Sequence, residues 1–178
     1  DSFGARPTLK LSYSHPPDAS TQMAPLLRFD VSQLPSTAHI ADARLSLYLV
    51  SSSDSERDLR GQVHGLLRAW DENSATWNQP TDGESWAEPG AQAEGQAHSE
   101  WASAAQRVSE VESWYEFDVT EMVSAWAGDP SSNYGLIIMA LAGDSEANVT
   151  MDFASREGTT LALRPQLAIT YSYPLVNY

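Results

Sequence analysis

The chain has 178 residues, 42% of them hydrophobic, which is enough for one ordinary domain with its own core. Its 24 acidic residues exceed its 10 basic residues and give a formal net charge of −14. A surface of this sign repels phosphate groups, which disfavours nucleic acid and anionic membranes as partners. The absence of cysteine excludes disulfide scaffolds, cysteine metal sites and thiol nucleophiles. No apolar run approaches the roughly 20 residues that cross a bilayer, so we expect no membrane insertion.

Alternation of apolar and polar residues predicts strands along most of the chain. The segments with strand signals are 8–13, 26–31, 40–50, 61–70, 107–111, 114–119, 149–154 and 161–171. Residues 135–142 differ from these because they form a nearly continuous apolar run. Such a run is typical of a strand that is covered on both faces.

One short helix is predicted at about 119–127. Its apolar residues recur at the i, i+3, i+4 and i+7 positions of one helix face, as Val119, Met122, Val123 and Trp126. Asp118 or Thr120 can cap this helix, and Glu121 follows Asp118 at capping-box spacing. Gly128 is expected to end it.

A long region at about 71–105 is rich in Gly, Pro, Ser, Glu and Ala and carries no strand or helix pattern. Loops of this length are unusual in a compact domain, so we expect Trp77, Trp86 and Trp101 to hold it against the sandwich. These elements together predict an all-β fold, a jelly-roll-like antiparallel β-sandwich with one short helix. The expected domain spans 1–171, followed by a C-terminal tail at 172–178.

Several motifs occur in an order that is specific to one known family. They are Leu26-Leu-Arg-Phe-Asp-Val-Ser-Gln-Leu-Pro35, Ile40-Ala-Asp-Ala-Arg-Leu-Ser-Leu47, Trp70-Asp-Glu-Asn-Ser-Ala-Thr-Trp77, Phe117-Asp-Val-Thr120 through Trp126, Asn133-Tyr-Gly-Leu136, Ser155-Arg-Glu157 and Arg164-Pro-Gln-Leu167. In these motifs the chain resembles the DNRLRE-type domains, also described as family 96 carbohydrate-binding modules. The resemblance implies a jelly-roll sandwich, secretion or surface display, and an accessory role in polysaccharide-processing proteins.

Members of that family open with an extra strand, to which almost nothing in this chain corresponds. A sandwich without that strand has unpaired backbone groups along one edge. We expect a segment of a neighbouring copy to complete the edge, which would give head-to-tail filaments. The expected donor is the tail, through Tyr173, Leu175, Val176 and Tyr178. The alternatives are that the first strand lies outside this sequence or that the start is aligned wrongly.

The sequence shows no catalytic signature, so we expect no enzyme activity. The histidines His15, His39, His64 and His98 are scattered, which disfavours a zinc site. No phosphate-binding loop or nucleophile elbow is present. Paired carboxylates for glycoside hydrolysis are the alternative, since the long region is acidic, but a sequence cannot show such a pair.

Three kinds of binding site remain as expectations. No cofactor is required, but structural calcium is a candidate, with Asp71, Glu72, Asp144 and Asp152 as ligands or, alternatively, as parts of a solvated acidic rim. Candidates for stacking on a saccharide are Trp77, Trp86, Trp101 and Tyr115, with core packing or anchoring of the long region as the alternative. Asn148 begins an Asn-Val-Thr sequon and is the expected glycosylation site.

Two functions remain open. The first is a structural or adhesive subunit of an extracellular assembly, a filament whose partners are copies of the same chain. The alternative is a soluble carbohydrate-binding module that targets polysaccharide through tryptophans of the long region. Both place the protein outside the cell or on its surface, after removal of a signal peptide.

Overall fold

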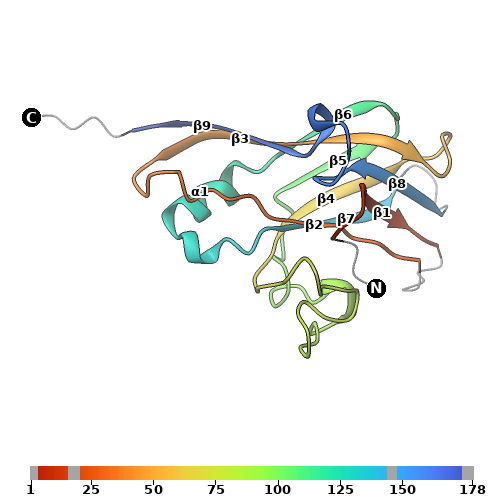
Figure 1. Ribbon diagram of the computed structural model, residues 1–178, viewed down its shortest axis with the longest axis horizontal. Coiled ribbons are helices and arrows are strands. Elements are labelled where there is room, and N and C mark those ends of the chain that lie inside the picture. The colour runs from red at the N-terminus through yellow and green to blue at the C-terminus, as the bar shows by residue number, and fades with distance from the viewer. Residues whose placement is uncertain (1–3, 16–20, 144–147, 174–178) are drawn as a thin grey trace, which may run out of the picture.

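The computed structural model describes residues 4–15, 21–143 and 148–173, and within these residues it is an all-β sandwich with one α-helix (Figure 1). The predicted fold class is confirmed. The first sheet contains β1 (Thr8–Tyr13), β8 (Val149–Ala154), β3 (His39–Ser52), β6 (Ser113–Asp118) and β9 (Gln166–Ser172). The second contains β2 (Leu26–Leu27), β7 (Leu136–Ala142), β4 (Leu59–Gly65) and β5 (Ala104–Val108).

Strand β3 organises the first sheet because it is long enough to pair with three neighbours. β6 runs antiparallel along one side of it, with Leu45 opposite Phe117. On the other side, β9 pairs with residues 39–46 and β8 pairs with residues 49–52. The order of the first sheet is therefore β1-β8-β3-β6, with β9 beside β8 along β3.

The main core lies between the two sheets. Alternate residues of β3 point into it, and Leu45, Leu47 and Leu49 are fully buried. Phe117 of β6 and Phe153 of β8 are buried with them. Helix α1 (Thr120–Gly128) adds Val123 and other apolar residues to the same core.

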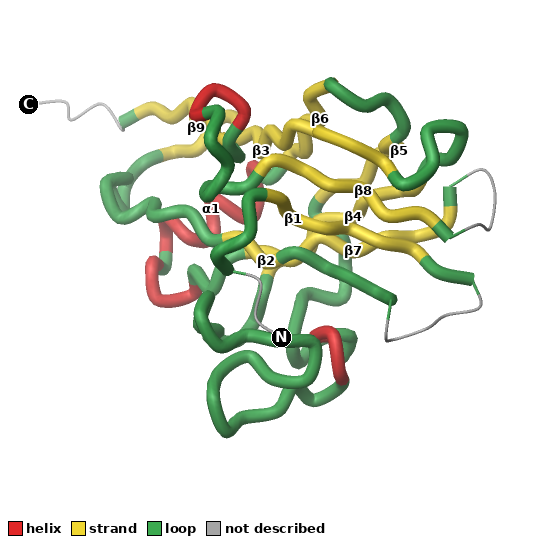
Figure 2. The backbone as a smooth tube through the Cα atoms, turned by 45° about the vertical axis from the view of Figure 1, so that its right-hand side comes forward, coloured by secondary structure: helices red, strands yellow, loops and turns green. Residues whose placement is uncertain are grey.

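Strand β7 is covered on both faces, as its apolar run predicts. Leu136 and Ile138 point into the main core, while Ile137 belongs to a second apolar cluster on the other face. That cluster includes Leu66 and Trp86 of the long connection from β4 to β5. We call residues 66–103 the loop lobe, which lies against β2 and β7 outside the sandwich (Figures 1 and 2).

Several predicted boundaries are wrong in instructive ways. The strand predicted at 26–31 pairs only at Leu26 and Leu27. β4 ends at Gly65, so the loop lobe begins earlier than residue 71, and its only regular element is a short 3-10 helix, Pro89–Ala91. The strand predicted at 161–171 begins at Gln166, because Leu161–Leu163 form a 3-10 turn before it.

The predicted helix is confirmed with a shift of one residue. The Asp118 side chain accepts hydrogen bonds from the backbone N–H of Thr120 at 3.0 Å and from its hydroxyl at 2.7 Å. These bonds fix the start of α1 in place of the predicted capping box with Glu121, since the N-cap residue is Val119. They also lower the pKa of Asp118 below its ordinary value, because they stabilise the carboxylate.

Candidate functional site: a groove between two edge strands

A groove lies at the margin of the sandwich where β1 and β2 are the edge strands of their sheets. The chain after β1 first returns along it: Ser12 N donates to Met23 O at 3.0 Å, and Met23 N donates to Ser12 Oγ at 2.8 Å. The chain then crosses to the second sheet, where Leu26 and Leu27 pair with β7. A space of about 480 Å³ remains between these two edge strands, which belong to different sheets.

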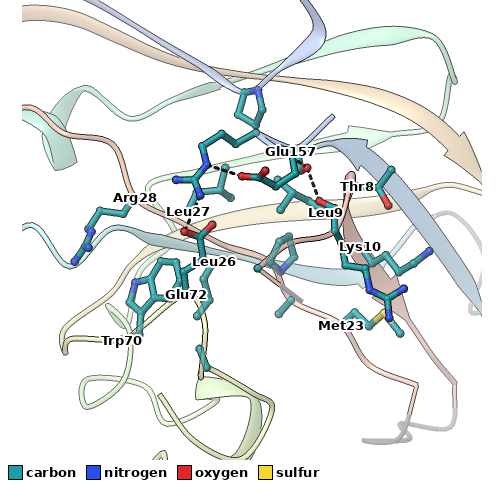
Figure 3. A pocket seen from close by; sticks show the side chains of 18 of the residues that line it. Thr8, Leu9, Lys10, Met23, Leu26, Leu27, Arg28, Trp70, Glu72 and Glu157 are labelled. Atoms are coloured by element: carbon teal, nitrogen blue, oxygen red, sulfur yellow. Dashed lines mark hydrogen bonds and ion pairs between the residues drawn. The ribbon is translucent and has the colours of Figure 1, made fainter. Parts of the chain in front are cut away.

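The walls of the groove are largely apolar and come from both sheets and the loop lobe (Figure 3). Their apolar side chains are Leu9, Met23, Ala24, Pro25, Leu26, Leu27, Phe29, Trp70, Ala75, Trp77, Trp86 and Pro165. Groups of this kind can pack against the apolar face of a pyranose ring.

Three indoles of the loop lobe differ in how they are held. Trp86 is 5% exposed, and its Nε1–H donates to Thr76 O at 3.0 Å. Trp70 is half-buried and donates to Tyr134 O at 2.8 Å. Trp77 is half-buried, but its Nε1 is a buried donor without a hydrogen-bond partner in the described part of the chain. A buried donor without a partner is costly, so a ligand acceptor there would be favoured.

Glycine permits the packing of Trp77. Gly90 has a φ of +74°, and a Cβ at this position would collide with the Trp77 ring. Only glycine adopts this backbone conformation without strain and leaves room for the indole.

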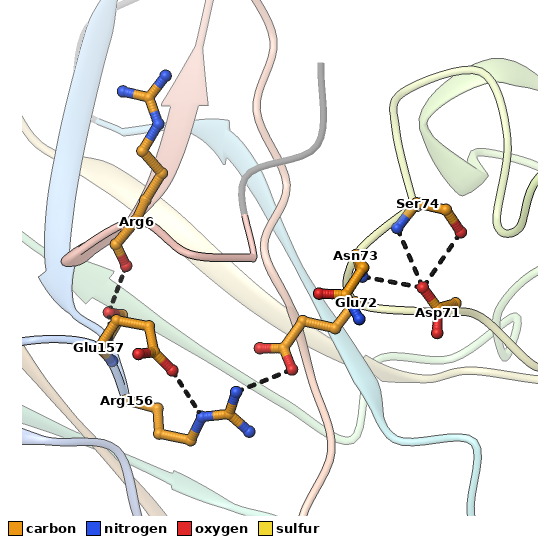
Figure 4. A network of polar contacts seen from close by, with 8 residues as sticks. Arg6, Asp71, Glu72, Asn73, Ser74, Arg156 and Glu157 are labelled. Carbon is orange, nitrogen blue, oxygen red and sulfur yellow. Dashed lines mark hydrogen bonds and ion pairs between the residues drawn. The ribbon is translucent and has the colours of Figure 1, made fainter.

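One end of the groove is built from a turn that is fixed to the N-terminal segment (Figure 4). The buried Ser155 donates its hydroxyl to Arg6 O at 2.6 Å, and its N–H bonds Pro7 O at 3.2 Å. The same hydroxyl accepts from Glu157 N at 3.0 Å. These bonds place Arg156 and Glu157 at the rim of the groove.

Arg156 connects this turn to the loop lobe. Its Nε donates to Glu157 at 2.9 Å and its Nη2 to Glu72 at 3.0 Å. The carboxylates of Glu157 and Glu72 raise the pKa of Arg156, so the guanidinium stays charged. Gly4 lies so close to Glu72 that a Cβ there would collide with the Glu72 carbonyl.

Cationic side chains gather at this groove. Five of the ten in the chain line it: Arg6, Lys10, Arg28, Arg156 and Arg164. Among the described acidic residues, only Glu72 and Glu157 do so. The groove is thus a positive site on a protein with a net charge of −14.

With the site described, the chain can be compared with known proteins. The family model of the disaggregatase related repeat domain matches residues 11–169. The chain belongs to the disaggregatase related repeat family. A search of curated proteins found no match. The family shown differs from the DNRLRE-type family that the motifs resemble, and the resemblance holds at the coarser level of a β-rich domain.

The predicted saccharide-stacking residues of this disaggregatase related repeat domain do not form one site. Trp77 and Trp86 line the groove, but Trp101 does not and is 83% exposed. Tyr115 packs against the main core, and its ring meets that of Phe153 edge to face with 6.3 Å between the ring centroids. A saccharide role for Trp101 and Tyr115 stays a prediction.

The predicted calcium ligands that the structure describes do not form one site either. Asp71 Oδ1 accepts bonds within its own turn from Asn73 and Ser74, whereas Glu72 points to Arg156 (Figure 4). Asp152 pairs with Lys10 at 2.6 Å. Asp144 lies outside the described residues. No group of three or more potential ligands occurs in the part of the chain that the structure describes, and calcium binding stays a prediction.

The remaining predicted sites lie at the surface. Asn148 is exposed next to β8, and its side-chain oxygen accepts from His15 N at 2.7 Å. Tyr173 is 63% exposed and faces Tyr171 edge to face at 5.5 Å, while Leu175, Val176 and Tyr178 lie outside the described residues. No helix in the described ranges is long and apolar enough to cross a membrane.

Sequence reasoning missed the cations of the groove. One signal was available: in a chain with ten basic residues, four lie in short segments that flank strands β1, β2, β8 and β9, and a fifth, Lys10, lies in β1. Only the topology shows that these segments meet.

Proposed function

We propose that this disaggregatase related repeat domain is a non-catalytic saccharide-binding module that uses the groove between β1 and β2. The observation that carries the proposal is the combination of three indoles with polar groups of both sheets around one space of about 480 Å³. That volume suits a short stretch of sugar units, and the mixture of aromatic faces and hydrogen-bonding groups suits their apolar faces and hydroxyls. We place the module outside the cell, where polysaccharide is accessible.

Trp77→Ala is the variant that tests this function. We expect the full chain to bind at least one member of a panel of neutral and acidic polysaccharides in affinity electrophoresis or calorimetry. Trp77→Ala should weaken that binding about tenfold or more, because a stacking face is lost. Trp114→Ala is the matched control, since Trp114 is partly exposed on β6 and lies outside the groove. Absence of binding to the whole panel, or equal effects of the two variants, would contradict the proposal.

A second function is favoured by the backbone of the same margin. Ser12 N points away from β8 toward Met23, and the two-residue alternation of an antiparallel ladder turns the N–H of Lys10 to the same side. An edge of this kind accepts an added strand. We propose strand addition by another copy, and hence filament formation, as the alternative function.

Mass measurement of the full chain over a range of concentrations tests strand addition. The alternative predicts concentration-dependent oligomers, and filaments in electron micrographs. Deletion of 172–178 should abolish them if the tail is the donor. A monodisperse monomer at high concentration would contradict the alternative and leave the groove free for a saccharide.

A further inference from the structure

Strand β9 has a neighbouring strand on only one side of its backbone. It lies along β3 (Figure 1), on the same side of β3 as β8, and β1 pairs with β8 alone. The side of β9 that faces away from β3 therefore has no neighbouring strand among the described residues. A side of this kind presents backbone groups that another strand can bind. We propose that two copies of this chain form a dimer by pairing their β9 strands along this edge.

The contacts of β3 show which backbone groups of β9 face the open side. Ala43 directs its backbone away from β9, since its carbonyl oxygen accepts from Val119 N at 3.0 Å. Ile169 lies opposite Ala43 in the ladder between β3 and β9. In an antiparallel ladder the backbone groups of such a pair point away from each other, and the pattern repeats at every second residue. The N–H and C=O groups of Leu167, Ile169 and Tyr171 consequently point outward.

This edge lacks the features by which natural proteins prevent strand pairing. β9 has seven residues, and none of them is charged or a proline. The other edge strands of the described chain are protected, because β1, β5 and β6 contain charged residues and β2 has only two residues. Charged side chains, proline and short length are common protections of an edge strand. An added strand therefore meets the least resistance at β9.

A second copy of the chain fits this edge because the edge is complementary to itself. The outward groups are evenly spaced around Ile169, so two antiparallel β9 strands can meet there on a two-fold axis. Ile169 then pairs with the partner's Ile169, and Leu167 pairs with the partner's Tyr171. The pairs exchange about six backbone hydrogen bonds in all. A net charge of −14 repels a second copy in general, whereas the uncharged β9 permits close approach.

The apolar side chains of the edge fit the same register. Leu167 and Ile169 are half-buried at the margin of the main core, and Tyr171 is 37% exposed. These residues alternate along β9 and so lie on one face of the sheet. In the proposed register each Tyr171 lies directly opposite the partner's Leu167, and an aromatic ring beside an aliphatic side chain stabilises a cross-strand pair. Pairing thus buries apolar surface that a single copy leaves accessible to water.

The dimer differs from the filament that strand addition at β1 would form. Two-fold pairing uses the same edge of both copies and closes after two, whereas head-to-tail addition continues. The pairing does not depend on what the groove binds. Arg164 and Pro165 line the groove and directly precede β9, so the two grooves begin at opposite ends of the paired strands. A long polysaccharide would then find two sites on one particle, which raises the apparent affinity without a new contact.

Sedimentation of the full chain over a range of concentrations tests the dimer, and amide hydrogen exchange locates it. We expect a monomer–dimer equilibrium that stops at two copies. The amides of Leu167, Ile169 and Tyr171 should exchange about tenfold more slowly in the dimer than in the monomer, while those of Ala168 and Thr170, which face β3, should be protected in both. A monomer at every concentration, growth beyond two copies, or outward amides that exchange equally fast in both states would overturn the inference.

A matched pair of double variants tests the register. Ala168 and Thr170 are exposed, and in the proposed dimer each lies opposite the other residue of the partner. Ala168→Lys with Thr170→Lys opposes like charges and should weaken the dimer about tenfold or more, although it lowers the net negative charge of each copy. Ala168→Glu with Thr170→Lys opposes unlike charges at an unchanged net charge and should retain the dimer. Equal dimerisation of the two variants would overturn the inference, and amide exchange of the unmodified chain decides it if either variant fails to fold.

Discussion

The two margins of the sandwich differ in what lies between their edge strands. At the groove margin, a space lined by cations and indoles lies between β1 and β2. At the opposite margin, β5 and β6 are the edge strands, and a short turn at 109–112 joins them. The hydroxyl of Tyr115 holds this turn: it accepts from Ser109 N at 3.1 Å and Glu110 N at 2.7 Å and donates to Glu110 O at 2.9 Å.

The charged side chains at the two margins also differ in sign. The β5–β6 margin carries the exposed carboxylates of Glu110, Glu112, Glu116 and Asp118. The groove margin carries half of the chain's cations. A margin that is closed by a turn needs only to be solvated, whereas a margin with a space between its strands can hold a ligand. The difference teaches that the topology of the edges decides where a binding site can form in this sandwich.

The largest expected effect is a loss of stability when a side chain is removed from the wall of the groove. Trp86→Ala should lower the free energy of unfolding by about 3–5 kcal/mol, because Trp86 is buried in the apolar cluster of the loop lobe. Urea denaturation measures the loss. Trp114→Ala near the other margin is the control, because Trp114 is 40% exposed and contacts Tyr48 edge to face at 5.3 Å. A smaller loss for Trp86→Ala than for the control would contradict the role of the cluster.

A matched pair of hydroxyl deletions separates structure from binding. Ser155→Ala and Tyr115→Phe each remove a hydroxyl that both donates and accepts hydrogen bonds, and each should cost about 1–3 kcal/mol of stability. Only Ser155→Ala should also weaken saccharide binding, because Ser155 places the Arg156 turn at the groove. Thermal melting and titration of both variants provide the comparison. Equal binding by the two would show that the Ser155 turn does not position the site.

Acidification should loosen the loop lobe. His64 on β4 and His98 in the loop lobe both donate from Nδ1 to Ser99 O, at 2.9 and 2.7 Å. The centroids of the two imidazole rings are 4.6 Å apart. Burial lowers the pKa of His64 below its ordinary value of 6.5; the Ser99 bond and Glu94 oppose this shift, and His98 adds to it. The unfolded chain therefore binds the proton more readily than the folded chain.

The stability from neutral His64 is fully present above pH 6.5 and is lost as the pH falls toward the lowered folded pKa. The slope should not exceed about 1.4 kcal/mol per pH unit for one such group. Denaturation between pH 7.5 and 5 measures it. His64→Gln should flatten this dependence, and His39→Gln, at an exposed position, should retain it. If His64→Gln retained the slope, another group would be responsible.

The smallest expected effect concerns the start of α1. Asp118→Asn should cost less than about 1 kcal/mol, since the side chain is half exposed and its hydrogen bonds can partly persist. The pKa of Asp118 is lowered, so its contribution is present above its unfolded pKa and disappears as the pH falls through the folded value. The variant should therefore converge with the wild type in acid. Divergence between them at low pH would contradict this account of the helix start.

The sequence predicts the elements better than their pairing. Leu27, Phe29 and Val31 alternate as expected and all pack at the main core, but the ladder stops after Leu27. Beyond it, the Asn133 side chain donates to Phe29 O at 2.9 Å in place of a neighbouring strand. Alternation reports which side chains are buried, and it does not report which backbone groups are paired.

The groove could not be predicted from the sequence for a related reason. Arg6, Arg28, Glu72 and Arg156 meet only because the chain crosses between sheets after β1 and because Ser155 fixes the β8–β9 connection to the N-terminal segment. Arg28, Glu72 and Arg156 each belong to a different motif of the sequence, and no motif shows which of these segments meet in space. The tryptophans of the loop lobe were noticed, but residue type alone did not separate the half-buried Trp77 from the exposed Trp101.

The most direct test of the groove as the binding site is the set of indole N–H signals in a nuclear magnetic resonance titration with the saccharide that binds. The account predicts that the signal of Trp77 moves first and furthest, with a smaller change at Trp70, while Trp101 and Trp114 stay in place. Movement confined to Trp101 or Trp114 would place the ligand elsewhere and contradict the account.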